Sequence, residues 1–196
     1  NVEFPTRRGR FQAVRGVNLT VKAGEVLGLV GESGAGKSTI GNAIIDLLEA
    51  PGQISGGSIL FEGEELCGRS ELEMRRLRGN RIGMIFQDPQ TSLNPLMTVG
   101  AQLVETIEKT NDLSGSEVEG RAIELLEQVG ITEAKARLSA YPHQFSGGMR
   151  QRVVIALALA GDPDLIIADE PTTALDVSIQ AQILDLIKQL CRQRSL

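Results

Sequence analysis

The segment Gly31-Glu-Ser-Gly-Ala-Gly-Lys-Ser38 constrains the fold more than any other part of this 196-residue chain. It fits the pattern G-x-x-x-x-G-K-[ST], in which glycines let the backbone curl so that successive N–H groups point at phosphate oxygens. An apolar run at 25–30 precedes the segment, and a helical pattern at 37–48 follows it. The positive N-terminal end of that helix would face the same anion. The sequence therefore predicts a strand, a phosphate-binding loop and a helix in succession.

Two side chains of this motif would contact a bound nucleotide directly. Lys37 would reach the β- and γ-phosphates, and the hydroxyl of Ser38 would ligate Mg²⁺. The alternative interpretation is an ordinary glycine-rich turn before a helix, which the specific spacing disfavours. We therefore expect nucleotide binding by the loop and the start of the helix, namely Gly31, Glu32, Ser33, Gly34, Ala35, Gly36, Lys37, Ser38 and Thr39.

An acidic pair, Asp169 and Glu170, ends a short apolar segment at 165–168. Such a pair is common by itself, but downstream of a phosphate-binding loop it supplies the second half of a nucleotide site. The carboxylate of Asp169 would hold Mg²⁺ directly or through water. Glu170 would polarise an attacking water as the general base.

Strand and helix patterns alternate along the chain. Strand patterns lie at 25–30, 59–61, 82–86 and 165–168, and helical patterns lie at 37–48, 147–160 and 177–191. The stretch 99–140 is polar and helical, with Gly115, Gly120 and Gly130 interrupting it, and we expect it to form a helical insert outside the main sheet. The alternation predicts an α/β core with a largely parallel sheet.

Charge and hydropathy exclude several classes of protein. The chain carries 25 acidic and 20 basic residues, a net charge of −5, which argues against a broadly basic surface for nucleic acid or anionic membranes. No stretch approaches the roughly 20 apolar residues that a membrane-spanning helix needs. Cys67 and Cys191 are far apart and lack metal-ligand spacing, so we expect reduced thiols.

With these residues in view, the chain resembles the nucleotide-binding domains of ATP-binding cassette (ABC) proteins. Four further segments carry the resemblance, and one of them is Pro142-His-Gln144, directly before the signature motif. Phe86-Gln-Asp-Pro89 is similar to the family's glutamine loop, and Glu170-Pro-Thr-Thr-Ala-Leu-Asp176 is similar to its aspartate loop. Phe145-Ser-Gly-Gly-Met-Arg-Gln-Arg152 resembles the signature motif, with Met149 in place of the usual glutamine. The match covers nearly the whole chain, in order and at the family's spacing.

The resemblance implies ATP and Mg²⁺ as ligands and assigns a catalytic set of Glu170, Gln87 and Lys37. The amide of Gln87 would contact both Mg²⁺ and the attacking water, so the implied metal ligands are Ser38, Gln87 and Asp169. Adenine would stack on Phe11, with the guanidinium plane of Arg8 as the alternative.

The resemblance also implies a head-to-tail dimer. The signature residues Ser146, Gly147, Gly148 and Met149 would bind the γ-phosphate of ATP held by the opposite subunit. Asp176 would lie at the dimer interface, and it is also in position to be the N-cap of the last helix. His143 precedes the signature, and we expect it to be a surface residue.

The fold that the resemblance implies is a P-loop NTPase core with a mostly parallel sheet, an N-terminal antiparallel β part and a helical subdomain. We expect one ABC ATPase domain over 1–196, with a core of about 1–91 and 146–196 and a helical subdomain of about 92–145. The family's switch histidine would fall beyond Leu196. We therefore expect the chain to be C-terminally truncated and its ATP hydrolysis to be impaired.

Three strings, at 86–95, 141–150 and 174–182, resemble the oligopeptide, dipeptide and nickel importer branch of the family. That branch implies an ATPase subunit on the cytoplasmic face of the cell membrane. Its partners would be a second ATP-binding subunit, identical or homologous, integral membrane permease subunits and, indirectly, a solute-binding protein. Peptides are the first expectation for the cargo, with nickel, glutathione and oligosaccharides open.

Two other functions remain open at this point. One is an ABC ATPase acting on DNA or ribosomes, although the long coiled-coil insert of the DNA-repair members is absent and we expect no nucleic-acid partner. The other is a nucleotide-sensing module that binds ATP without turnover, against which Glu170 argues.

Overall fold

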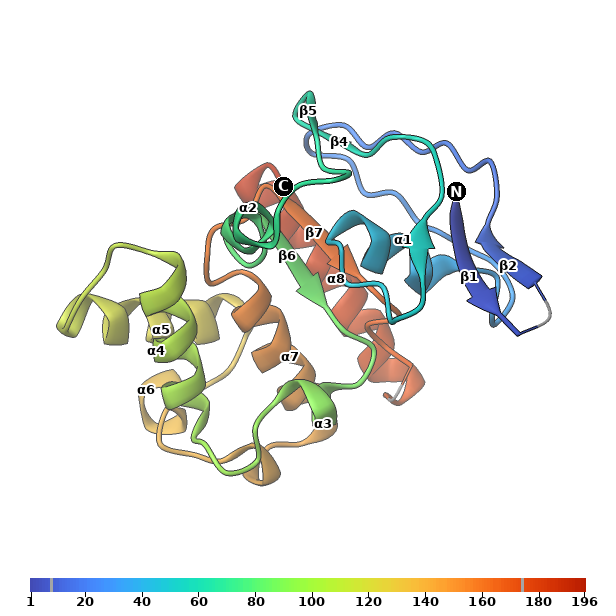
Figure 1. The fold of residues 1–196 in the computed structure, drawn as a ribbon. Helices are drawn as coiled ribbons and strands as arrows, with labels where there is room; N and C mark the ends of the chain where they lie inside the picture. Colours follow the sequence, from blue (N-terminus) through green and yellow to red (C-terminus); the bar gives the residue numbers. More distant parts are fainter. Residues whose placement is uncertain (8, 174) are drawn as a thin grey trace. The chain divides into compact units, whose positions relative to one another are not determined.

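The computed structural model describes residues 1–7, 9–173 and 175–196. The chain divides into two compact units, 1–78 and 79–196, which are unit 1 and unit 2 below. Figure 1 labels their helices and strands. Among the described residues, no helix combines the length and the apolar character needed to cross a bilayer.

Unit 1 begins with an antiparallel sheet of β1 (Val2–Thr6), β2 (Gly9–Val14) and β3 (Gln53–Ile54), in the order β2-β1-β3. Glu3 lies in the central strand β1 and is buried, with 5% of the residue exposed. Its Oε1 accepts hydrogen bonds from Arg10 Nη1 at 3.0 Å and Gln53 Nε2 at 2.8 Å, one from each neighbouring strand. A buried charge needs such partners, so Glu3 favours this strand order. The predicted N-terminal antiparallel β part is confirmed.

The rest of unit 1 contains α1 (Lys37–Ile44), a hairpin of β4 (Leu60–Phe61) and β5 (Glu64–Glu65), and α2 (Glu71–Leu77). Helix α2 begins with a capping box, in which Glu73 N donates to Ser70 Oγ and Ser70 N donates to Glu73 Oε2. The hydrogen bonds from Ser70 lower the pKa of the Glu73 carboxyl. The strand pattern at 59–61 is confirmed as β4, and the helix predicted at 37–48 ends earlier, at Ile44.

The strand predicted at 25–30 is wrong, because the structure has no strand there. Its apolar side chains are exposed instead, with Val26 at 56% and Val30 at 99%. A strand requires a neighbouring strand to satisfy its N–H and C=O groups, and no described residue pairs with this segment. The apolar pattern indicated burial but did not identify a pairing partner.

Unit 2 contains the parallel pair of β6 (Ile82–Ile85) and β7 (Leu165–Ala168). Their register aligns Ile82 with Leu165 and Ile85 with Ala168, and Figure 1 shows the two strands side by side. An ion pair between Arg81 and Asp164 joins the residues just before the two strands. The strand patterns at 82–86 and 165–168 and the parallel pairing are confirmed.

The helical structure predicted for 99–140 is confirmed, and its placement outside the main sheet stays a prediction. The segment contains three α-helices, α4 (Val99–Thr110), α5 (Ser116–Gln128) and α6 (Ala134–Arg137). Gly115 is the N-cap residue of α5, with φ +59°, and Gly130 follows the C-cap of α5 with φ +76°, so a glycine lies just beyond each end of this helix. Gly120 lies inside α5 and does not interrupt it.

The remaining helices of unit 2 flank this insert along the chain. They are α3 (Pro89–Ser92), the short 3₁₀ helix η1 (Pro142–Gln144), α7 (Gly147–Ala158) and α8 (Val177–Arg194). Side chains of α4, α5 and α7 form the apolar core of unit 2, where Leu103, Ile107, Leu125, Leu126 and Ile155 are at most 1% exposed. The helices predicted at 147–160 and 177–191 are confirmed with shifted ends.

One carboxylate joins three segments of unit 2. Asp162, in the loop between α7 and β7, accepts hydrogen bonds at Oδ1 from Arg121 Nη2 of α5 and Arg194 Nη1 of α8, both at 2.6 Å. The two arginine side chains are 14% and 18% exposed, whereas that of Asp162 is 56% exposed. Both guanidinium groups therefore bind a carboxylate that water also reaches.

Gly100 and Gly120 both lie inside helices, but their surroundings leave different amounts of space for a side chain. A Cβ at Gly100 would lie 2.6 Å from Leu138 O, and a Cβ at Gly120 would meet no atom within 4 Å. We expect Gly100→Ala to lower the free energy of unfolding by about 2 kcal/mol through overpacking. Gly120→Ala should raise it by about 0.5 kcal/mol, because alanine is the better helix former. Denaturant unfolding of both variants checks this, and equal stabilities would contradict the close approach.

Candidate functional site

The glycine-rich loop of unit 1 curls through two glycines with left-handed backbone conformations. Gly34 and Gly36 adopt φ values of +78° and +88°, in the left-handed region that favours glycine. A Cβ at Gly36 would lie 2.6 Å from Ala13 O, so the loop approaches the backbone of β2 too closely for a side chain. Residues 31–35 are exposed, and α1 begins directly after Gly36. The exposed loop therefore leads directly into the N-terminal end of an eight-residue helix, whose first residues are half-buried.

The side chain of Lys37 is hydrogen-bonded to the backbone of the loop that precedes it. Its Nζ donates to Gly31 O at 3.0 Å and to Glu32 O at 2.9 Å, which holds the ammonium over the loop backbone. Ser38 and Thr39 follow in the first turn of α1 and are half-buried. A fixed ammonium, a hydroxyl and a helix N-terminus are the donors that bind phosphate, so these residues fit a nucleotide phosphate.

Of the two residues predicted for adenine stacking, the structure describes only Phe11. Phe11 lies in β2, opposite Phe4 in the antiparallel register, and is 60% exposed. Its ring is therefore accessible to a ligand, and stacking stays a prediction. Arg8 lies outside the described residues.

In unit 2, the register of the parallel pair brings Gln87 and Glu170 together. Asp169 N donates to Ile85 O at 2.9 Å, which continues the pairing one residue beyond Ala168. Gln87 and Glu170 each follow the last aligned pair by two residues. Their side chains meet there, with Gln87 Nε2 donating to Glu170 Oε2 at 3.1 Å. Two predicted site residues thus lie together at the carboxyl end of the strands.

Glu170 has an unusual backbone conformation for a residue with a side chain. Its φ is +43°, in the left-handed region, which costs a non-glycine residue about 1 kcal/mol. Such outliers gather at functional sites. Pro171 follows, and Thr173 N donates to Glu170 O at 3.2 Å to close a turn.

Thr173 is a residue that sequence reasoning missed. Its Oγ1 donates to Glu170 Oε2 at 3.0 Å, so a second side chain contacts the predicted general base. The available signal was Pro171, because proline favours the second position of a turn and a turn brings its fourth residue back toward its first.

The predicted magnesium ligands are suited to the ion by their chemistry. Mg²⁺ takes oxygen ligands, usually one or two from protein carboxylates or hydroxyls, and keeps several waters. Ser38 and the half-buried Asp169 offer such oxygens, and the amide of Gln87 offers a third. Over the described part of the chain there is no cluster of three His, Cys, Asp or Glu residues that would hold a metal without such help.

The signature residues lie at the start of α7. Ser146 is its N-cap, with Oγ accepting from Met149 N at 3.3 Å. Ser146 and Gly147 are exposed, whereas Gly148 and Met149 are half-buried. A Cβ at Gly148 would lie 2.8 Å from Ile179 Cγ2, so glycine lets α7 begin close to α8.

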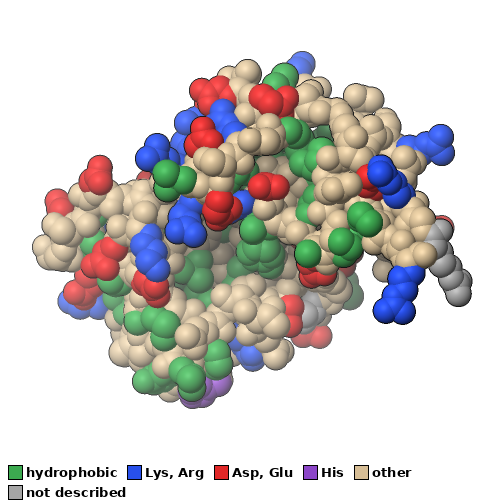
Figure 2. Space-filling model, in the orientation of Figure 1, with side chains coloured by type: hydrophobic (Ala, Val, Ile, Leu, Met, Phe, Trp, Pro, Cys, Tyr) green, Lys and Arg blue, Asp and Glu red, His purple; other side chains and the backbone are tan. Residues whose placement is uncertain are grey.

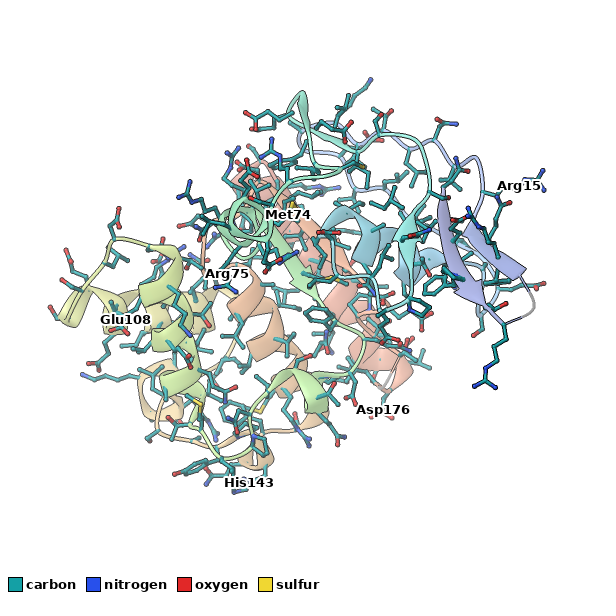
Figure 3. All side chains as sticks on the ribbon, in the orientation of Figure 1. Arg15, Met74, Arg75, Glu108, His143 and Asp176 are labelled. Atoms are coloured by element: carbon teal, nitrogen blue, oxygen red, sulfur yellow. The ribbon has the colours of Figure 1, made fainter. Side chains whose placement is uncertain are left out.

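Asp176 and His143 are labelled in Figure 3. Asp176 is the N-cap residue of α8, and its side chain makes no capping hydrogen bond to a described residue. Its carboxylate is exposed to solvent. His143 is exposed, as predicted, and is the purple residue in Figure 2; its ring stacks on that of Tyr141 with centroids 5.6 Å apart.

Comparison with known proteins gives a consistent result. A family model described as "ABC transporter" matches residues 14–173. The oligopeptide transport ATP-binding protein OppD of Bacillus subtilis is 56% identical over 190 residues, which are 96% of this chain and 53% of that protein. The dipeptide transport ATP-binding protein DppD of the same organism is 50% identical over 194 residues, 98% of this chain and 58% of that protein. The chain thus spans about half the length of these relatives.

A solved structure is also similar. The ATP-binding cassette MJ0796, in a dimeric post-hydrolysis state bound to ADP and Pi, superposes with a TM-score of 0.83 at 32% identity. The match covers 97% of this chain and 80% of that one.

The cap of α7 gives a prediction about stability. Ser146→Ala removes the acceptor for Met149 N, and we expect the free energy of unfolding to fall by about 1 kcal/mol. Ser146→Asp keeps an acceptor at the N-cap and should retain most of that stability. Denaturant unfolding measures both variants, and an alanine variant as stable as the parent would contradict the cap.

Proposed function

This chain belongs to the ABC transporter family, and from that membership we propose that it is the ATP-binding and ATP-hydrolysing part of a peptide importer. The observation that carries the proposal is the loop at 31–38, where left-handed glycines and the Lys37 ammonium make a phosphate-binding backbone at the start of α1. The names of the relatives, which are oligopeptide and dipeptide transport ATP-binding proteins, support peptides as the cargo.

In this proposal ATP binds to residues 31–39, with Lys37 contacting the β- and γ-phosphates and Phe11 stacking on adenine. Ser38, Gln87 and Asp169 hold Mg²⁺, which neutralises charge on the phosphate oxygens when it is bound. The exposed loop and the exposed ring of Phe11 support this assignment.

For hydrolysis, we propose that the carboxylate of Glu170 accepts the proton of a water that attacks the γ-phosphate in line. The amide of Gln87 orients that water, and Lys37 stabilises the charge that develops on the phosphate. The hydrogen bond between Gln87 and Glu170 supports a joint role, because it already brings amide and carboxylate together.

The proposal includes partners. Ser146, Gly147, Gly148 and Met149 bind the ATP of a second, identical or homologous subunit, with Asp176 at the interface between the two. The exposed start of α7 and the exposed Asp176 support this arrangement, as does the dimeric state of the similar cassette.

Within one ABC ATPase domain, we propose an ATPase core of about 1–91 and 146–196, with the helical subdomain at about 92–145 docking on permease subunits. This arrangement locates the protein on the cytoplasmic face of the membrane, where a solute-binding protein delivers cargo to the permease from the other side.

The binding part of the proposal is tested with Lys37→Ala. Losing the ammonium removes charge-assisted hydrogen bonds to phosphate, so the Kd for ATP should rise about 100-fold. Calorimetric titration of the full-length protein measures this, with Lys22→Ala, an exposed lysine outside the loop, as the control. Undiminished affinity of Lys37→Ala would defeat the site assignment.

The catalytic part is tested with Glu170→Gln in the full-length protein. The amide cannot accept the proton, so we expect kcat to fall by at least about 100-fold while ATP still binds. ATP should then accumulate in a closed dimer, visible by size-exclusion chromatography with Mg-ATP. A variant that hydrolyses ATP at the parental rate, or stays monomeric with ATP, would count against the general base or the dimer, respectively.

A further inference from the structure

Two side-chain donors meet at one oxygen of Glu170. Gln87 Nε2 approaches Oε2 at 3.1 Å from beyond β6, and Thr173 Oγ1 approaches the same atom at 3.0 Å from beyond β7. A glutamate side chain has three rotatable bonds, so an unrestrained carboxylate samples many orientations. Two donors on one oxygen restrict the carboxylate to a small part of that range.

The donor from Thr173 comes from the same turn as the carboxylate. The backbone N–H of Thr173 donates to Glu170 O at 3.2 Å, and its hydroxyl donates to the Glu170 side chain. One residue thus closes the turn twice, through main chain and side chain. Because Pro171 limits φ at the second position of the turn, the hydroxyl is held near the carboxylate by local geometry.

The two donors, the Gln87 amide and the Thr173 hydroxyl, differ in whether they have another proposed role. The amide of Gln87 is assigned to contact Mg²⁺ and the attacking water. Those contacts compete with its hydrogen bond to Glu170. The hydroxyl of Thr173 has no such assignment, and it belongs to the segment that carries Glu170. The hydroxyl is therefore the donor that keeps the carboxylate oriented when the amide engages a ligand.

We propose that Thr173 is a positioning residue for ATP hydrolysis, whose hydroxyl holds the Glu170 carboxylate in the orientation that accepts a proton from water. The inference rests on the proposed function, since it assumes that Glu170 is the general base. Orientation of a catalytic group contributes to the rate of the chemical step and not to ground-state binding of ATP. The effect should therefore appear in kcat, with the Kd for ATP unchanged.

The test uses Thr173→Val and the smaller Thr173→Ala in the full-length protein, assayed for ATPase rate and ATP affinity. Neither side chain donates, so kcat should fall about fivefold, as expected for losing one hydrogen bond, while the Kd for ATP stays within twofold. Thr173→Ser keeps the hydroxyl and should restore most of the rate. Thr172→Val is the matched control, because the side chain of Thr172 makes no hydrogen bond to a described residue.

The outcomes separate this inference from the proposed function. If the parent protein hydrolyses ATP and Thr173→Val and Thr173→Ala match its kcat, the positioning role is overturned and the proposed function stands. A fall in kcat shared with Thr172→Val, or not restored by Thr173→Ser, also overturns it, as does a parallel loss of ATP affinity. If the parent protein binds ATP without any turnover, the proposed hydrolysis fails and the inference fails with it.

Discussion

The hydrogen-bond register between β6 and β7 aligns Ile85 with Ala168, and the candidate site of unit 2 depends on that alignment. In a parallel pair, residues at equal distance beyond the last aligned pair leave the sheet at the same edge. Gln87 and Glu170 are such residues, and their side chains are hydrogen-bonded. A slip of one residue would turn one of them to the opposite face of the sheet. The chemistry assigned to this edge therefore depends first on the pairing of β6 with β7, because that pairing positions the side chains of Gln87 and Glu170.

Much of the fold and the site could be predicted, because it rests on local patterns. The glycines and Lys37 of the loop, the acidic pair after β7, and the longer helices of unit 2 are all encoded within short windows of sequence. The strand at 25–30 was predicted wrongly because its pattern specifies apolar side chains and not a pairing partner. Thr173 was missed because its role comes from a turn that brings its hydroxyl to Glu170, and composition does not reveal such a contact.

Glycines in this chain show why residue type alone is not enough. Gly36 has a positive φ and also approaches Ala13 O, so two independent constraints require glycine there. Gly120 has neither constraint and lies in an exposed turn of α5. Only the three-dimensional neighbours separate a glycine that the site needs from one that the helix merely tolerates.

The carboxylate of Asp162 has a consequence for how the last helix is attached. The end of α8 and the middle of α5 are joined through one oxygen of a side chain that is 56% exposed. Dissolved ions screen a charge that water reaches, while they leave apolar packing intact or strengthen it. The ion pair between Arg194 and Asp162 at the C-terminal turn of α8 therefore weakens as ionic strength rises. The hydrogen bond from Arg194 to the uncharged Gln128 and the buried side chains of Ile183, Leu186 and Leu190 do not depend on a charge pair and hold the helix at any ionic strength. Ionic strength thus acts on one of the contacts that attach this helix and spares the apolar ones.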